Sequence, residues 1–118
     1  SALEVAMVRT HCQAGHDVLK NIDFPWPIAR IVLQHHELID GSGYPLGLKG
    51  EEILLEARIL TVADVVEAMM SHRPYRPAVA LEAALSEIVM NRGTHYDARV
   101  VDACLKLFRE KNYILPAA

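Results

Sequence analysis

Two adjacent histidines, His35 and His36, stand just before a glycine-rich run at positions 40–45, Asp-Gly-Ser-Gly-Tyr-Pro. Neutral imidazole is the commonest metal ligand among side chains. The run cannot continue a helix, because its glycines are conformationally free and its proline lacks a backbone donor. Tyr44 places one aromatic ring in the resulting loop. These residues predict a helix that ends at a metal site, with a shaped loop folded over it.

The two histidines do not have to share one metal ion. Neighbouring residues of a helix point roughly 100° apart, so His35 and His36 could ligate two adjacent ions, or one could ligate while the other packs. The alternative is a helix C-terminus that carries histidines because its dipole favours their cationic form. His11, on the apolar stripe of an earlier helix, leaves a similar choice between a metal ligand and a core histidine bonded to backbone.

A later segment, predicted to be helical over 54–70, carries a polar residue at every third position. These residues are Arg58, Thr61, Asp64 and Glu67. Each step of three drifts about 60° around a helix of 3.6 residues per turn, so at least one of them points inward. A buried carboxylate needs a cation or several donors. Histidines with an inward Asp64 suit iron or manganese, whereas the alternative is an exposed Asp64 paired with Arg58.

Two arginines, Arg73 and Arg76, flank a Pro-Tyr pair directly after that segment. Planar guanidinium groups suit the recognition of phosphate. Arginine beside proline is also common in surface turns, so this pattern alone leaves both interpretations open.

Hydrophobic periodicity predicts an all-α fold, a compact bundle of about five helices and no strand. The expected helices cover 3–20, 27–38, 54–70, 79–91 and a segment that follows Asp97 as its N-cap. The long connection at 40–50 holds four of the glycines, which favours a functional loop over a simple turn.

Length and composition indicate one domain. The chain has 118 residues, of which 52% are apolar, enough for a single core. A net charge of −3 gives no basic field for duplex nucleic acid or an anionic membrane. No apolar run reaches the roughly 18 residues that a membrane span needs. Cys12 and Cys104 have no paired spacing and fall on apolar stripes, so we expect reduced core thiols in a cytoplasmic protein.

Taken together, the order and spacing of these motifs resemble the HD-GYP family, a helical branch of the HD phosphohydrolase superfamily. The match runs over most of the chain. It comprises His11 with Gly15, His35-His36-Glu37, the run at 40–45, Ala57-Arg58-Ile59, Val62-Ala63-Asp64 and Arg73-Pro74-Tyr75-Arg76. The resemblance implies hydrolysis of the bacterial second messenger cyclic di-GMP to pGpG and GMP. It also implies a centre of two or three divalent ions, with iron or manganese expected.

The resemblance further assigns roles to individual residues. By motif, the metal-ligand positions are His11, His35, His36 and Asp64. Tyr44 resembles the ring beside the bound nucleotide, with Gly43 and Pro45 completing its loop. Arg73 and Arg76 match positions expected to meet substrate phosphates.

The chain also departs from the family pattern. The family's His-Asp pair, followed shortly by a lysine, belongs upstream of the position of His11 and has no counterpart here. The pair His16-Asp17 lies in the wrong place and lacks that lysine. Leu38 stands where arginine is usual, and Glu67 where aspartate is common. We therefore expect residues 1–118 to be the C-terminal part of one HD-GYP domain, truncated at its N-terminus, and inactive alone because the missing aspartate is expected to bridge the metals.

Several partners follow from this interpretation. We expect cyclic di-GMP as ligand, an upstream sensor or receiver domain in the parent protein, a diguanylate cyclase domain as a candidate partner, and self-association through apolar surface that the upstream helices would cover. Two alternatives remain. One is a non-catalytic signalling or partner-binding module. The other is an HD-type phosphohydrolase of a different nucleotide, against which the loop at 40–45 and the arginine motif argue.

Overall fold

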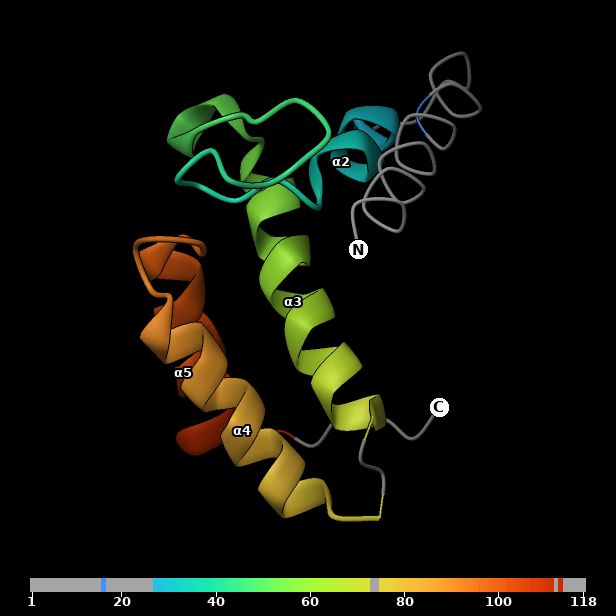
Figure 1. Ribbon diagram of the computed structural model, residues 1–118. Coiled ribbons are helices and arrows are strands. Elements are labelled where there is room, and N and C mark those ends of the chain that lie inside the picture. Colours follow the sequence, from blue (N-terminus) through green and yellow to red (C-terminus); the bar gives the residue numbers. More distant parts are fainter. Residues whose placement is uncertain (1–15, 17–26, 73–74, 112, 114–118) are drawn as a thin grey trace.

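The computed structural model describes residues 16, 27–72, 75–111 and 113. Its elements are α2 (Ile28–Gln34), the short 3-10 helix η1 (Gly50–Glu52), α3 (Leu55–His72), α4 (Pro77–Met90) and α5 (Ala98–Arg109) (Figure 1). The described part contains no β-strand beyond two isolated bridges, so the all-α fold is confirmed. The helix predicted at 3–20 lies, apart from one residue, outside the described part, as do His11 and Arg73.

Helix α3 is the central element of the described fold. Helices α4 and α5 lie along one side of it, while α2 and the loop that follows α2 lie at its N-terminal end (Figure 1). The core forms where α3, α4 and α5 meet. Its buried residues are Val62 and Val66 of α3, Ala84, Leu85 and Ile88 of α4, Tyr96, and Val101 of α5. One face of α3 therefore anchors the helix, which leaves other positions on it free to line a site.

The helix boundaries differ from the expected ones where a side chain or proline intervenes. Helix α2 ends at Gln34 rather than at residue 38, and the Glu37 amide closes a turn onto the Gln34 carbonyl at 2.9 Å. Helix α4 begins at Pro77, because proline suits the first turn, where its missing N–H is not needed. Asp97 is the N-cap of α5, as predicted, and its Oδ1 accepts from the amides of Arg99 at 2.8 Å and Val100 at 3.3 Å.

Arg58 joins the start of α3 to the start of α5. Its Nη1 lies 2.6 Å from Oδ2 of Asp97, and its Nε donates to the Ile53 carbonyl at 3.1 Å. Both side chains of the ion pair are nearly buried, at 10% and 11% exposed. Burial would by itself raise the pKa of Asp97, but the hydrogen bonds from Arg58 and Arg99 outweigh it and hold that pKa below its ordinary value. The alternative pairing of Arg58 with Asp64 is therefore wrong.

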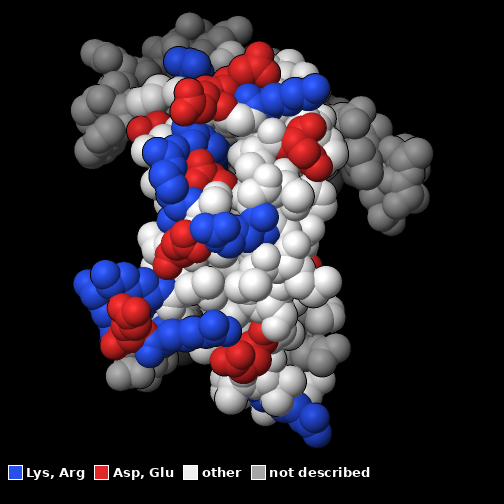
Figure 2. All heavy atoms as spheres, turned by 90° about the vertical axis from the view of Figure 1, so that its left-hand side faces the viewer, with Lys and Arg blue, Asp and Glu red and all other residues white. Residues whose placement is uncertain are grey.

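The surface carries both signs of charge in small groups. Lysine and arginine alternate with aspartate and glutamate on the face shown in Figure 2. Ion pairs of the described part include Arg92 with Asp102 at 2.8 Å and Arg109 with Glu82 at 3.8 Å. That face offers no extended basic surface of the kind that binds duplex nucleic acid. None of the described helices is both long and apolar enough to cross a membrane.

Candidate metal and nucleotide site

Four of the predicted site residues meet at one open cavity of about 540 Å³. They are His35, His36, Tyr44 and Asp64. The other lining residues are Leu38, Thr61, Val65, Glu67, Ala68 and Tyr96. The cavity is thus bounded by the turn after α2 and the glycine-rich loop that directly follows it, by the middle of α3, and by Tyr96 before α5.

His35 presents a defined nitrogen to this cavity. Its Nδ1 lies 2.6 Å from the Val32 carbonyl oxygen. A carbonyl can only accept a hydrogen bond, so Nδ1 carries a proton, and in the neutral imidazole Nε2 keeps its lone pair. Nε2 lies 3.8 Å from Oδ2 of Asp64. A histidine oriented through its second nitrogen is the usual arrangement of a metal ligand.

His36 lies between His35 and the loop. Its ring centroid is 4.1 Å from that of His35, and it stacks on Tyr44 at 5.3 Å with an interplanar angle of 22°. Burial, and then the neighbouring His35, lower the pKa of His36, while Asp64 acts in the opposite direction. The lowered pKa favours the neutral imidazole, which is the form that binds a metal ion.

Asp64 faces the cavity and not the core. Its side chain is 52% exposed. The inward polar residues of α3 are instead Arg58, paired as described above, and Thr61, which is 7% exposed. The Thr61 hydroxyl lies 2.7 Å from the carbonyl of His35 and 2.8 Å from that of Ala57, and donates to one of them at a time. Thr61 therefore fixes the His35 backbone against α3 beside Asp64.

Glu37 was part of the motif recognised in the sequence, but sequence reasoning gave it no role, and the structure shows that it holds the loop. It is 2% exposed, and its carboxylate accepts from the amides of Leu46 at 2.8 Å and Leu48 at 3.0 Å. A buried carboxylate is stable only with such donors. Glu37, which directly follows His36, therefore ties the loop at Leu46 and Leu48 to the histidine turn. The position of Glu37 could have indicated this role, because it stands between the two histidines and a loop whose backbone amides need acceptors.

Gly43 lets the loop pack directly on the backbone of the histidine turn. A Cβ at this position would lie 2.5 Å from the His36 oxygen and 2.6 Å from Cα of Glu37. The next amide, that of Tyr44, donates to the same His36 oxygen at 3.2 Å. The Tyr44–Pro45 peptide bond is cis. These contacts place the Tyr44 ring against His36.

The donor set fits a borderline transition metal but is not complete in the described part. Two imidazoles and a carboxylate line the same cavity, and donors of these kinds suit iron or manganese. Among the residues that the structure describes, however, no three histidine, cysteine or acidic side chains are arranged to hold an ion. Arg76 is exposed at the N-cap of α4 and does not line the cavity. A metal ion at this cavity would need a further ligand, and the candidate from the sequence is His11, which lies outside the described residues.

The sequence profile of the HD domain family matches residues 1–100, so the chain belongs to that family. Its curated relatives include the cyclic di-GMP phosphodiesterase response regulator RpfG of Xanthomonas campestris, 46% identical over 105 residues, which are 87% of this chain and 28% of the relative. The cyclic di-GMP phosphodiesterase of Thermotoga maritima is 42% identical over 109 residues, 91% of this chain and 30% of that protein. These relatives confirm the HD-GYP branch predicted from the sequence.

A solved structure gives the same assignment. The chain superposes on a cyclic GMP-AMP specific phosphodiesterase of Vibrio cholerae with a TM-score of 0.76 and 27% sequence identity, covering 92% of this chain and 25% of that one. The 3'3'-cGAMP-specific phosphodiesterase 3 of Vibrio cholerae is 36% identical over 99 residues, 84% of this chain and 22% of its own length. This chain therefore spans less than a third of each of these relatives.

Proposed function

We propose that this chain is part of a metal-dependent phosphodiesterase that hydrolyses cyclic di-GMP to pGpG and GMP in bacterial signalling. The observation that carries the proposal is the meeting of His35, His36, Tyr44 and Asp64 at one cavity. Relatives named as cyclic di-GMP phosphodiesterases support the same substrate.

HD-domain phosphohydrolases are metal-dependent as a class. In this protein His35, His36 and Asp64, together with His11, would hold the metal, and iron or manganese in a centre of two or three ions fits nitrogen and carboxylate donors. A bound ion would supply Lewis-acid stabilisation of phosphate charge and an activated water.

The protein's own side chains would position the substrate. Tyr44 offers an aromatic wall beside the candidate ligands, suited to a flat base. Arg73 and Arg76 would meet phosphate charge from the junction between α3 and α4. Glu37 and Gly43 would hold the Tyr44 loop in place, so that binding a nucleotide does not have to order the loop.

The four candidate ligands within this chain are fewer than a bridged metal centre uses. We expect the 118-residue chain alone not to turn over cyclic di-GMP, and the intact protein to do so if it carries the His-Asp pair. We also propose that the intact protein carries an upstream sensor or receiver domain, that a diguanylate cyclase domain is a partner, and that this chain self-associates. A non-catalytic signalling role remains the alternative if the intact protein lacks that pair.

A second substrate candidate is 3'3'-cGAMP. It is favoured by the relative and the solved structure whose names specify that dinucleotide. Both candidates contain guanine and a pair of phosphodiesters, so the candidate ligands do not discriminate between them.

The test is hydrolysis by the purified intact protein in Mn²⁺ or Fe²⁺, followed by chromatography of the products. Cyclic di-GMP, 3'3'-cGAMP and bis(p-nitrophenyl) phosphate are compared. We expect pGpG and GMP from cyclic di-GMP, and loss of turnover on Asp64→Asn. Faster hydrolysis of 3'3'-cGAMP would transfer the proposal to the second substrate. No hydrolysis of either dinucleotide with either metal would contradict the enzymatic function.

A further inference from the structure

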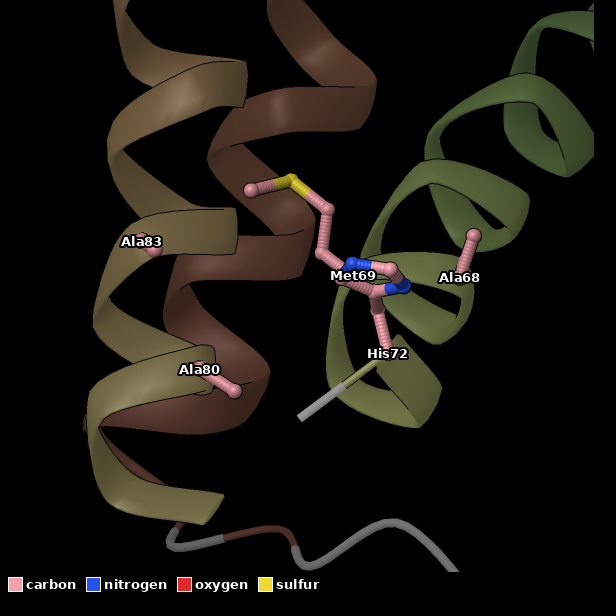
Figure 3. Close-up of a pocket in the computed structure, with 5 residues that line it drawn as sticks. All are labelled: Ala68, Met69, His72, Ala80 and Ala83. Atoms are coloured by element: carbon pink, nitrogen blue, oxygen red, sulfur yellow. The ribbon is translucent and has the colours of Figure 1, made fainter. Parts of the chain in front are cut away.

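A second cavity lies between α3 and α4 (Figure 3). Its volume is about 370 Å³, and its walls are formed by Ala68, Met69 and His72 of α3 with Ala80 and Ala83 of α4. Ligand pockets in proteins span roughly 300 to 1,000 Å³, so this cavity is large enough for one flat ring system. None of the site residues predicted from the sequence lines this second cavity.

The second cavity adjoins the candidate site along one stripe of α3. Ala68 lines both cavities. Asp64, Ala68 and His72 are spaced four residues apart, so each is displaced by roughly 40° around the helix from the one before and the three follow a slanted stripe. His72 is displaced from Asp64 by roughly 12 Å along the helix axis. Ala68, between them in the sequence, has only a methyl side chain, and the separation is comparable with the length of one nucleotide.

The lining of the second cavity has the chemistry of a base-binding slot. Its walls are almost wholly apolar, as the flat faces of a purine require. The side chains of Met69 and His72 reach toward the space between α3 and α4 (Figure 3). A thioether makes favourable contacts with aromatic rings, and an imidazole can stack on a base or bond to its edge.

We propose that this second cavity receives a purine base of the nucleotide whose phosphate lies at the Asp64 end of α3. The inference rests on the proposed function, which places a nucleotide phosphate at that end. It adds a second place for a base, toward the C-terminal end of α3, whereas the loop that carries Tyr44 lies at the N-terminal end of that helix (Figure 1). His72 is then a substrate-binding residue and Ala68 a residue that must remain small.

The inference is tested by filling the cavity in the intact protein. Ala83→Phe places a ring in the α3–α4 cavity. Ala103→Phe is the matched control, because Ala103 is also an exposed alanine, on α5, and lines a different groove. Binding of GMP and of ribose 5-phosphate is measured by calorimetry in Mn²⁺ buffer. We expect Ala83→Phe to weaken GMP binding about tenfold, Ala103→Phe to leave it unchanged, and ribose 5-phosphate to bind equally to both.

A second pair of variants tests His72 without filling the cavity. His72→Ala removes both stacking and the polar edge, whereas His72→Phe keeps a ring. We expect weaker GMP binding by His72→Ala and partial recovery by His72→Phe. Thermal unfolding of each variant identifies any that has lost its fold, and the remaining variants then decide the question.

The outcomes separate this inference from the proposed function. If the protein binds GMP in the predicted way but does not hydrolyse cyclic di-GMP, the enzymatic function fails and the base site stands. Equal GMP binding by the Ala83 and Ala103 variants would overturn the base site, even in an active enzyme, and would leave the cavity as a gap in helix packing. Equal affinity of the unmodified protein for GMP and ribose 5-phosphate would overturn it as well.

Discussion

His35 and His95 each lie near an aspartate, but only His35 lies in a setting suited to metal chemistry. His35 is 3.8 Å from Asp64 at the cavity, with its other nitrogen bonded to a backbone carbonyl. His95 is 3.6 Å from Asp40 in a loop contact, where both side chains are more than a third exposed. The difference lies in the surroundings of each pair, which makes His95 a natural control for His35.

Glu37 carries the most direct prediction for a single residue. Glu37→Gln keeps one accepting oxygen but turns an amide group toward a backbone donor of the loop. We expect a loss of about 1 to 3 kcal/mol of unfolding free energy, because one buried donor is left unsatisfied. Denaturant unfolding measures it. Glu51→Gln, at an exposed glutamate of η1, is the control and should change little. Equal stability of the two variants would show that Glu37 does not hold the loop.

At the scale of elements, the glycine-rich loop works because it packs directly on the turn after α2. The amide of Ile39 donates to the His95 carbonyl at 3.1 Å and that of Gly50 to the Ile39 carbonyl at 3.0 Å. Asp40 accepts from the Ser42 amide at 2.9 Å. These bonds close the loop upon itself and onto the segment before α5, so Tyr44 is carried by a structured element.

Gly43→Ala tests that packing. The added methyl would press on the His36 and Glu37 backbone, so we expect Tyr44 to move off His36 and the affinity for nucleotide to fall. Gly50→Ala is the comparison, because Gly50 has φ +49° but nothing within 4 Å of its Cβ position. It should cost about 1 kcal/mol of stability from backbone strain and leave nucleotide binding intact. Calorimetry with GMP gives the binding result. Equal binding by both variants would contradict the packing argument.

The ion pair between Arg58 of α3 and Asp97 at the start of α5 should make the stability of the fold depend on pH. The pKa of Asp97 is lower in the folded protein than its ordinary value of 3.8. Its stabilising effect is therefore complete above that value and is lost as the pH falls through the folded pKa. We expect Asp97→Asn to cost about 3 kcal/mol near neutral pH, because Arg58 loses its buried partner, and less below about pH 4. Unfolding measured across pH tests this, and a cost that does not change with pH would contradict it.

Much of this arrangement could be predicted from sequence, and the exceptions have physical causes. Periodicity located α3 to α5 because each buries one apolar stripe, and Asp97 was a recognisable N-cap. The end of α2 was placed too late, since the bonds that turn the chain there come from Glu37 and the distant loop. The expectation of an inward Asp64 was wrong, because the inward charged residue of α3 is Arg58, whose partner Asp97 lies far along the chain.

At the scale of the whole molecule, one helix serves both the core and the candidate site. Val62 and Val66 of α3 are buried against α4 and α5, while Asp64 between them faces the cavity. Asp64 is thus carried by a helix that packs against α4 and α5, and this packing limits the movement of the side chains at the candidate site. Metal binding should in turn stabilise the whole fold.

That coupling gives a prediction for the intact protein. Any ion that binds only the folded state raises the unfolding temperature by mass action. We expect Mn²⁺ at a hundredfold excess over its dissociation constant to add about 2.7 kcal/mol to the unfolding free energy. The increase should be absent in Asp64→Asn. A thermal shift of the same size in that variant would place the metal elsewhere.

The most direct test of the account is metal content and cyclic di-GMP turnover, measured on the same preparations of intact protein with His35→Ala and His95→Ala. Residues that only orient a metal ligand typically contribute about 10- to 100-fold to metal affinity or activity, so loss of a ligand itself should cost at least as much. We predict that His35→Ala loses bound manganese or iron together with turnover, while His95→Ala retains both. A His35→Ala protein that keeps its metal and its turnover would contradict the assignment of the site.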